Sequence, residues 1–317
     1  MEQQHSKGQW GSSFGFLMAA IGSAVGLGNL WGFPYKMGIN GGFAFLLLYI
    51  ILVIFVGFVI CAGELALGRH SGKGVVGAYE SIDKKYGFIG WFGWISPLLI
   101  LGFYLSLIHI LPICDTSVAL LAGLATLPAT FAMGMEPAAG PGMLFVTLQA
   151  VFGAMGAAGP IFGFIFYLLV FFAALTSSIG MMEGAVSAFM DRAAEKGKTP
   201  NRTKLSWIIA AISGVGSLIV SIDALGAGPL PKPFGLGTWL DAFDLFAEGF
   251  MMPIGCLVMA LLLGWFHPDY IDDEVRLGSA YKTKGFVKFC LKWIAPPFMI
   301  FIFIGQMDGF FGLGLFS

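Results

Sequence analysis

Long apolar segments separated by short polar connectors run through the whole chain. A helix that crosses a bilayer needs about 20 apolar residues. On that rule the sequence predicts spans near residues 14–36 (interrupted), 43–67, 88–110, 113–134, 160–190, 205–222, 243–265 and 287–311. The composition agrees, because 57% of the residues are hydrophobic, 11% are charged and the mean hydropathy is +0.86. The chain is therefore predicted to be an all-α, polytopic transmembrane helix bundle embedded in a lipid bilayer.

The connectors differ in charge, and this difference predicts their side of the membrane. Lys and Arg are concentrated in residues 69–87, 191–204 and 267–288, whereas residues 223–242 contain only Lys232. Cytoplasmic connectors are enriched in Lys and Arg. The three connectors rich in Lys and Arg and the N-terminus are thus predicted to be cytoplasmic, and residues 223–242 are predicted to be external. Three candidate spans then separate two cytoplasmic connectors where an even number is required, so one of them does not cross or the chain departs from a complete membrane fold.

The first apolar segment is interrupted where a plain membrane helix would be continuous. Gly22, Gly26 and Gly28 are followed by Asn29 and Pro34. Glycine lowers helix propensity and proline removes a backbone hydrogen bond. Irregular backbone at membrane depth is tolerated where it is buried in protein or lines a wet cavity. Secondary transporters use such broken helices to hold ions and anionic substrates near the midplane, so the pattern predicts a transporter.

Other functional classes find no support in the sequence. The net charge of −1 indicates no nucleic-acid partner. The four Cys lie in apolar segments without the spacing of metal ligands, and the four His are scattered. No metal-binding His pair, nucleophile motif or pair of catalytic acids occurs, so the chain is not predicted to be an enzyme.

Several motifs in the chain closely resemble the neurotransmitter:sodium symporter family, most of all its bacterial amino-acid-transporting members. They include Gln9-Trp10-Gly-Ser-Ser-Phe, the run from Gly22 to Pro34, Glu64-Leu-Ala-Leu-Gly-Arg69, Asp115-Thr-Ser-Val-Ala, Met135-Glu-Pro-Ala-Ala-Gly-Pro-Gly and Ala173-Ala-Leu-Thr-Ser-Ser178. The resemblance covers nearly the whole chain. It implies a LeuT-type inverted-repeat fold and sodium-coupled symport of an amino acid or a similar small amine or carboxylate. It also implies a multi-pass protein of the bacterial inner membrane.

The chain departs from the family in its middle. Residues 1–110 resemble family helices one to three, and residues 111–317 resemble helices seven to eleven, within a single transmembrane domain of 1–317. Family helices four to six have no counterpart, and this loss would explain the odd number of crossings. The alternative is therefore a non-transporting, internally deleted remnant of such a symporter.

The resemblance implies two sodium sites. The second family site is expected at the carbonyls of Gly22, Val25 and Ala173 and the hydroxyls of Thr176 and Ser177. The first is expected at the carbonyl of Ala24 and the side chains of Asn29 and Asp115, and it would be incomplete without family helix six. The alternative for Thr176 and Ser177 is that they hydrogen-bond to carbonyls of their own helix or join helices together.

The resemblance also implies a substrate pocket and two gates. The pocket would be lined by Ser23, Ala24, Gly26, Leu27, Gly28, Ile100, Tyr104, Ser177 and Met181. The cytoplasmic gate is expected at Lys7, Trp10 and Asp191, and the external one keeps Asp244 but has Gly32 in place of the family's Arg. Tyr104 could instead belong to an interfacial aromatic belt. Lys7 and Asp191 could be solvated flanking charges, and Asp244 an interfacial acid.

Overall fold

The structure, a computed structural model, describes residues 29, 32–103, 112–134, 136, 142–272 and 283–315. No strand occurs in these ranges, which consist of helices and their connectors. Five of the described helical segments are long and apolar enough to cross a membrane, namely Phe43–Ser71, Gly156–Glu195, Arg202–Asp223, Trp239–Phe266 and Lys284–Phe311. Each contains one of the predicted spans. The prediction of an all-helical, multi-pass bundle is confirmed.

The remaining predicted spans are described in part. Residues 88–110 correspond to α6, Gly87–Phe103, and residues 113–134 to α7, Pro112–Ala132. Of the interrupted first span, the structure describes the end, where Pro34 lies in the first turn of α2, Phe33–Ile39.

The chain divides into two compact units. The first comprises residues 1–40 and 106–179, and the second comprises residues 41–105 and 180–317, so that the long helix α9, Gly159–Glu195, contributes to both. The other described helices of the first unit are α2, α7, η4 (Met143–Thr147), α8 (Leu148–Ala154) and η5 (Gly156–Ala158).

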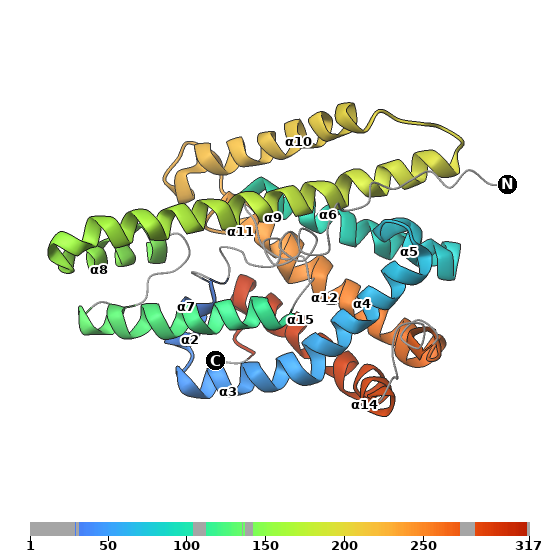
Figure 1. Ribbon diagram of the computed structural model, residues 1–317, viewed down its shortest axis with the longest axis horizontal. Coiled ribbons are helices and arrows are strands. Elements are labelled where there is room, and N and C mark those ends of the chain that lie inside the picture. Colours follow the sequence, from blue (N-terminus) through green and yellow to red (C-terminus); the bar gives the residue numbers. More distant parts are fainter. Residues whose placement is uncertain are drawn as a thin grey trace. The chain divides into compact units, whose positions relative to one another are not determined.

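Two packing contacts stand out among the described residues of the first unit. In the first, α2 lies along α7 (Figure 1), and the side chain of Met37 packs on the bare backbone of Gly123. In the second, Leu144 and Leu148 pack against Val170 of α9. The hydroxyl of Tyr167 donates a hydrogen bond of 2.6 Å to the carbonyl of Leu144, which joins α9 to the π-helical turn η4.

The second unit contains most of the chain. Its helices, besides the end of α9, are α3 (Phe43–Leu52), η2 (Val53–Gly57), α4 (Phe58–Ser71), α5 (Val75–Ile82), η3 (Lys84–Tyr86), α6, α10 (Arg202–Asp223), η6 (Ala224–Gly226), η7 (Pro233–Gly235), α11 (Trp239–Asp244), η8 (Leu245–Met251), α12 (Met252–Leu261), η9 (Leu262–Phe266), α14 (Lys284–Phe289), η10 (Cys290–Ile294) and α15 (Ala295–Phe311). Helix α4 ends at Ser71 and is followed by the C-cap residue Gly72, whose φ of 58° is left-handed and suits glycine.

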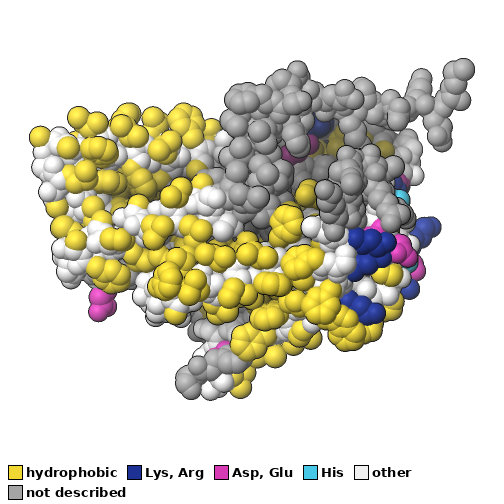
Figure 2. Space-filling model, turned by 60° about the horizontal axis from the view of Figure 1, so that its bottom comes forward, with side chains coloured by type: hydrophobic (Ala, Val, Ile, Leu, Met, Phe, Trp, Pro, Cys, Tyr) yellow, Lys and Arg dark blue, Asp and Glu magenta, His cyan; other side chains and the backbone are white. Residues whose placement is uncertain are grey.

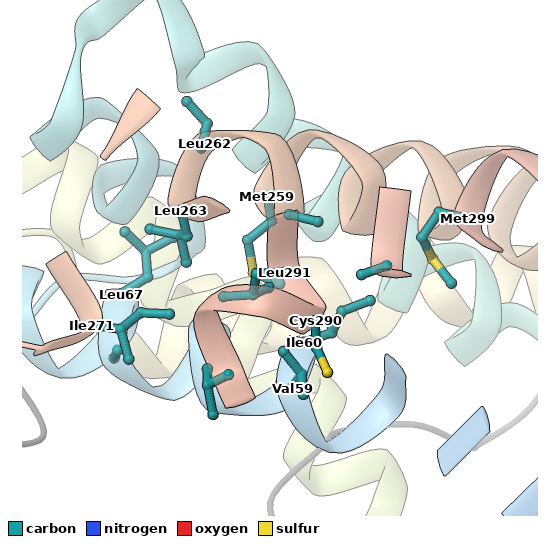
Figure 3. Packing of buried hydrophobic residues seen from close by; sticks show 14 of the residues in the cluster. Val59, Ile60, Leu67, Met259, Leu262, Leu263, Ile271, Cys290, Leu291 and Met299 are labelled. Carbon is teal, nitrogen blue, oxygen red and sulfur yellow. The ribbon is translucent and has the colours of Figure 1, made fainter. Parts of the chain in front are cut away.

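The core of the second unit forms where α4 meets η9, η10 and their neighbours. Figure 3 shows Val59 and Ile60 of α4 close to Leu291 and Cys290 of η10. Met259 of α12 and Leu263 of η9 belong to the same cluster. Cys290 and Leu291 are fully buried. Many large hydrophobic side chains outside such clusters are exposed, and Figure 2 shows hydrophobic side chains over much of the visible face, with Lys and Arg gathered at one edge. This distribution is expected of helices that face lipid rather than water.

Candidate functional site: an ion and substrate site on the long helix α9

Part of the predicted site lies outside the described residues. This holds for Lys7, Trp10, Gly22, Ser23, Ala24, Val25, Gly26, Leu27, Gly28 and Tyr104. Ile100 lies on α6 and Asp115 on α7, but their side chains are also outside the description. The described members of the predicted sodium and substrate sites are therefore Asn29, Ala173, Thr176, Ser177 and Met181.

Asn29 is buried, with 6% of its surface exposed. It lies a few residues before α2, in the segment that carries the predicted helix break. A buried side-chain amide has to be hydrogen-bonded or to hold an ion, because its desolvation is otherwise unfavourable. Burial of Asn29 is compatible with its predicted role as a ligand.

On α9, the predicted sodium ligands lie within one turn of helix. The hydroxyl of Thr176 donates hydrogen bonds to the carbonyls of Phe172, at 2.9 Å, and Ala173, at 3.1 Å. The carbonyl and hydroxyl oxygens expected to share one ion are thus neighbours. The same geometry is what a threonine makes when it only bonds back to its own helix, so both alternatives stated for Thr176 are compatible with it.

Ser177 is the more informative residue of the pair. It is 1% exposed, whereas Leu175 and Ile179 on the same stretch of α9 are 45% and 54% exposed. The apolar side chains thus face outward and the hydroxyl faces inward, which is the reverse of a serine in a water-soluble helix. Met181, one turn further, is also 1% exposed and shares this face of α9. Ser177 and Met181 are the two buried members of the predicted site on α9.

At its far end, α9 is joined to the short helix α5 by polar contacts. The carboxylate of Asp191 accepts a hydrogen bond from the backbone N–H of Gly74, directly before α5. Lys73 pairs with Glu195 at 2.7 Å, and this hydrogen bond raises the pKa of the Lys73 ammonium. Asp191 therefore satisfies an orphan donor at the N-terminus of α5 and places negative charge where the helix dipole favours it. This contact could not be predicted from the sequence, because it joins residues far apart in the chain.

Arg192 adds a further contact at this junction. Its guanidinium lies over the ring of Trp91, at 5.2 Å, and 3.6 Å from the carboxylate of Glu80. The nearby Trp94 donates a hydrogen bond of 3.1 Å to the carbonyl of Ala185. The end of α9 is thereby fastened to both α5 and α6, the two helices that follow α4.

The structure also places two acids near the segment 223–242. Asp244, the predicted gate residue, ends α11 and is half-buried. Asp223, which sequence reasoning missed, is 1% exposed and accepts hydrogen bonds from the N–H groups of Gly226, at 3.1 Å, and Trp239, at 3.0 Å. Asp223 ties the two ends of the connector together.

Another buried acid, Asp272, forms ion pairs with two lysines at the start of α14. The distances are 2.5 Å to Lys284 and 2.8 Å to Lys288, and Lys288 also pairs with Asp269 at 2.8 Å. Burial opposes ionisation of Asp272, but the two ammonium groups outweigh it and hold the pKa of this carboxyl below its ordinary value. The cluster joins the two segments that flank residues 273–282.

Together, the five apolar spans define a multi-pass helical membrane protein, and a buried serine, Ser177, lies on α9. Comparison with known proteins specifies the class. The sequence model of the sodium:neurotransmitter symporter family matches residues 7–114 and 132–313. The chain belongs to the sodium:neurotransmitter symporter family, whose members are secondary transporters rather than enzymes.

Individual relatives agree with this assignment. An uncharacterized sodium-dependent transporter of Bacillus subtilis is 25% identical over 447 residues, with 93% of this chain and 97% of the relative covered. An uncharacterized sodium-dependent transporter of Methanocaldococcus jannaschii is 40% identical over 99 residues, which are 31% of this chain and 20% of the relative. The human sodium-dependent neutral amino acid transporter SLC6A17 is 38% identical over 99 residues, 31% of this chain and 14% of that protein.

The fold is that of a solved transporter. The crystal structure of MhsT in complex with L-phenylalanine matches with a TM-score of 0.79 and 23% sequence identity, covering 95% of this chain and 100% of that chain. At this identity the match establishes the LeuT-type fold alone.

Proposed function

We propose that this protein is a sodium-coupled symporter of an amino acid. Membership of the sodium:neurotransmitter symporter family supports sodium coupling. Two relatives point to the substrate, since one is named a neutral amino acid transporter and the solved structure holds L-phenylalanine. The bacterial relative and the Lys and Arg of residues 69–87, 191–204 and 267–288 support a bacterial inner membrane with a cytoplasmic N-terminus.

The observation that carries the proposal is the burial of Ser177 among outward-facing apolar side chains of α9. Sodium is bound by hard oxygen ligands, and carbonyl and hydroxyl oxygens supply them without burying another full charge. The carbonyl of Ala173 and the hydroxyls of Thr176 and Ser177 are such ligands, and the carbonyls of Gly22 and Val25 would complete the cage. Ion binding there would favour one conformation of the transporter, and the substrate would bind next to it.

The remaining site residues enter the proposal by their positions. Ala24, Asn29 and Asp115 would serve the first sodium site. The substrate would lie against Ser23, Ala24, Gly26, Leu27, Gly28, Ile100, Tyr104, Ser177 and Met181. Lys7, Trp10, Asp191 and Asp244 would act in gating, and the hydrogen bond between Asp191 and Gly74 would link the cytoplasmic gate to α5.

A second candidate is a non-transporting remnant that lacks family helices four to six. The alignment with the Bacillus relative is much longer than this chain, so the relative has stretches without a counterpart here. The family match is also divided, with residues 115–131 left out. The difference in length favours an internal loss, and the unmatched stretch shows that the chain departs from the family directly after residue 114.

Sodium-titrated calorimetry with L-phenylalanine as the probe tests the proposal. We expect the wild-type chain to bind the probe in sodium and not in potassium, and the double variant T176A/S177A to lose this binding. S178A is the matched control, because the Ser178 hydroxyl donates to the carbonyl of Ala174 at 3.0 Å and is not a predicted ligand. Unchanged sodium dependence in the double variant would refute the cage. Failure of the wild type to bind any neutral amino acid would favour the remnant.

A further inference from the structure

Two tryptophans and a lysine form a cluster where the end of one membrane span meets the start of another. The indole N–H of Trp265, in η9, donates a hydrogen bond of 3.0 Å to the carbonyl of Lys292 in η10. The rings of Trp265 and Trp293 lie 5.1 Å apart and nearly edge to face. The ammonium of Lys292 lies 4.7 Å from the Trp265 ring and 5.7 Å from the Trp293 ring.

Close packing of η9 against η10 holds this cluster in place. A methyl group on Gly264 would lie 2.7 Å from the carbonyl oxygen of Leu291, so only glycine permits this approach of η9 to η10. Leu263 and Leu291 are buried in the core shown in Figure 3. Their neighbours Trp265 and Trp293 are 47% and 56% exposed. Both segments are π-helical turns, a form that is frequent at functional sites.

The cluster lies at the end of a candidate membrane span, where the edge of the bilayer is expected. Trp265 is the second-last residue of the span Trp239–Phe266, and Lys292 contacts it directly. Tryptophan is enriched at the membrane interface because its ring is apolar and its N–H is polar. A lysine at this depth extends its ammonium toward the headgroups.

Lys292 differs from the two lysines that precede it in the kind of group that its ammonium contacts. Lys284, Lys288 and Lys292 follow one another at intervals of four residues. The first two are neutralised by Asp269 and Asp272. Among the residues that the structure describes, no carboxylate lies within ion-pair distance of Lys292, and its partners there are the two indole rings. An ammonium that has no carboxylate partner among the described residues and is held between two indole rings is suited to an external anion.

We propose that Trp265, Lys292 and Trp293 form a binding site for the phosphate of an anionic phospholipid headgroup. The ammonium supplies the charge, and the indoles hold it in place and pack against the glycerol and upper acyl chain. Connector 267–288 is rich in Lys and Arg, which places the site on the side of the membrane where anionic lipids attract basic residues. The proposal is independent of transport, because it rests on the membrane placement of the spans and not on an ion or amino-acid site.

Fluorescence quenching by brominated lipids tests the site in the full chain. The protein is placed in phosphatidylcholine nanodiscs that contain increasing fractions of dibrominated phosphatidylglycerol, or of dibrominated phosphatidylcholine as reference. The quenching of Trp265 and Trp293 is obtained as the difference in tryptophan quenching between the wild type and the double variant W265F/W293F. We expect quenching at a lower mole fraction of phosphatidylglycerol than of phosphatidylcholine. The preference should fall about fivefold in K292Q, the effect of one lysine near an anionic surface.

Control variants separate this result from a general charge effect. K204Q removes an exposed lysine at the start of α10 and should keep the preference, as should K292R, which retains the positive charge. Inorganic phosphate should not displace the brominated lipid, and displacement would instead indicate a site for a soluble anion and overturn the lipid assignment. Equal quenching by the two lipids in the wild type, or an unchanged preference in K292Q, would also overturn the proposal.

Discussion

The contact between α5 and α6 predicts that replacing Gly90 of α6 by alanine destabilises the protein. At an open helix position the same replacement is expected to stabilise it. A methyl group on Gly90 would lie 2.5 Å from the Cα of Val76 and 2.9 Å from the carbonyl oxygen of Val75. Ordinary carbon–carbon contacts lie at about 3.5–4.0 Å, so the G90A variant has to move the two helices apart by about 1 Å. Val76 and Ile89 are 3% and 1% exposed, so the separation opens buried packing.

The magnitude follows from overpacking. Adding a methyl to a close-packed contact costs about 1–3 kcal/mol. Alanine in an open helix position instead gains about 1 kcal/mol over glycine. Gly214 of α10 is such a position, since no atom lies within 4 Å of a methyl built on it. We therefore expect G90A to destabilise the protein and G214A to stabilise it slightly or leave it unchanged.

The apparent Tm of both variants is measured in detergent by heating the protein with a thiol-reactive dye. Cys61 and Cys290 are buried, at 2% and 0% exposure, so their thiols react only when the second unit opens. An energy of this size shifts the apparent Tm by about 2–10 °C. A G90A variant as stable as the wild type would show that α5 does not pack against the backbone of α6 as the structure has it.

Two further predictions concern polar contacts of the second unit. D191A removes the acceptor of the Gly74 N–H, so hydrogen exchange of the α5 amides should accelerate, with a loss of about 1 kcal/mol in local stability. Exchange in α10 should not change. Equal protection of α5 in the variant and the wild type would exclude the cap. Asp272 has its pKa lowered below 3.8 by Lys284 and Lys288, so its ionised form stabilises the fold at neutral pH, and this stabilisation is lost as the pH falls through 3.8 and then through the folded-state pKa. D272N should therefore be less stable than the wild type at neutral pH and equal to it in strong acid, and a pH-independent difference in apparent Tm would contradict the ion pairs.

The apolar pattern was enough to locate the five described helical segments that are long enough to cross a membrane. Residues 205–222 and 287–311 were predicted, and the structure has α10 at Arg202–Asp223 and a continuous helical segment over Lys284–Phe311. A span of about 20 apolar residues has few alternatives in a bilayer, because its backbone must bond to itself. The π-helical turns within these spans were not predicted, since they depend on packing such as that of Gly264 against Leu291.

The polar contacts could not be predicted for a different reason. Asp191 is adjacent to Arg192 in sequence but bonds to Gly74, over a hundred residues earlier, and Asp223 bonds to Trp239 across a connector. Which distant donor a carboxylate finds depends on tertiary structure and leaves no periodic signal. The predicted ligands on α9 came from the family resemblance, to which the structure adds the burial of Ser177 and the bond from Thr176 to Ala173.

The most direct test of the central claim is uptake of labelled L-phenylalanine into proteoliposomes under an inward sodium gradient. We expect accumulation that requires the gradient, ceases when a sodium ionophore dissipates it, persists in S178A and is absent in T176A/S177A. Uptake no greater than that of protein-free liposomes, or uptake that is the same in potassium, would contradict sodium-coupled symport by this chain.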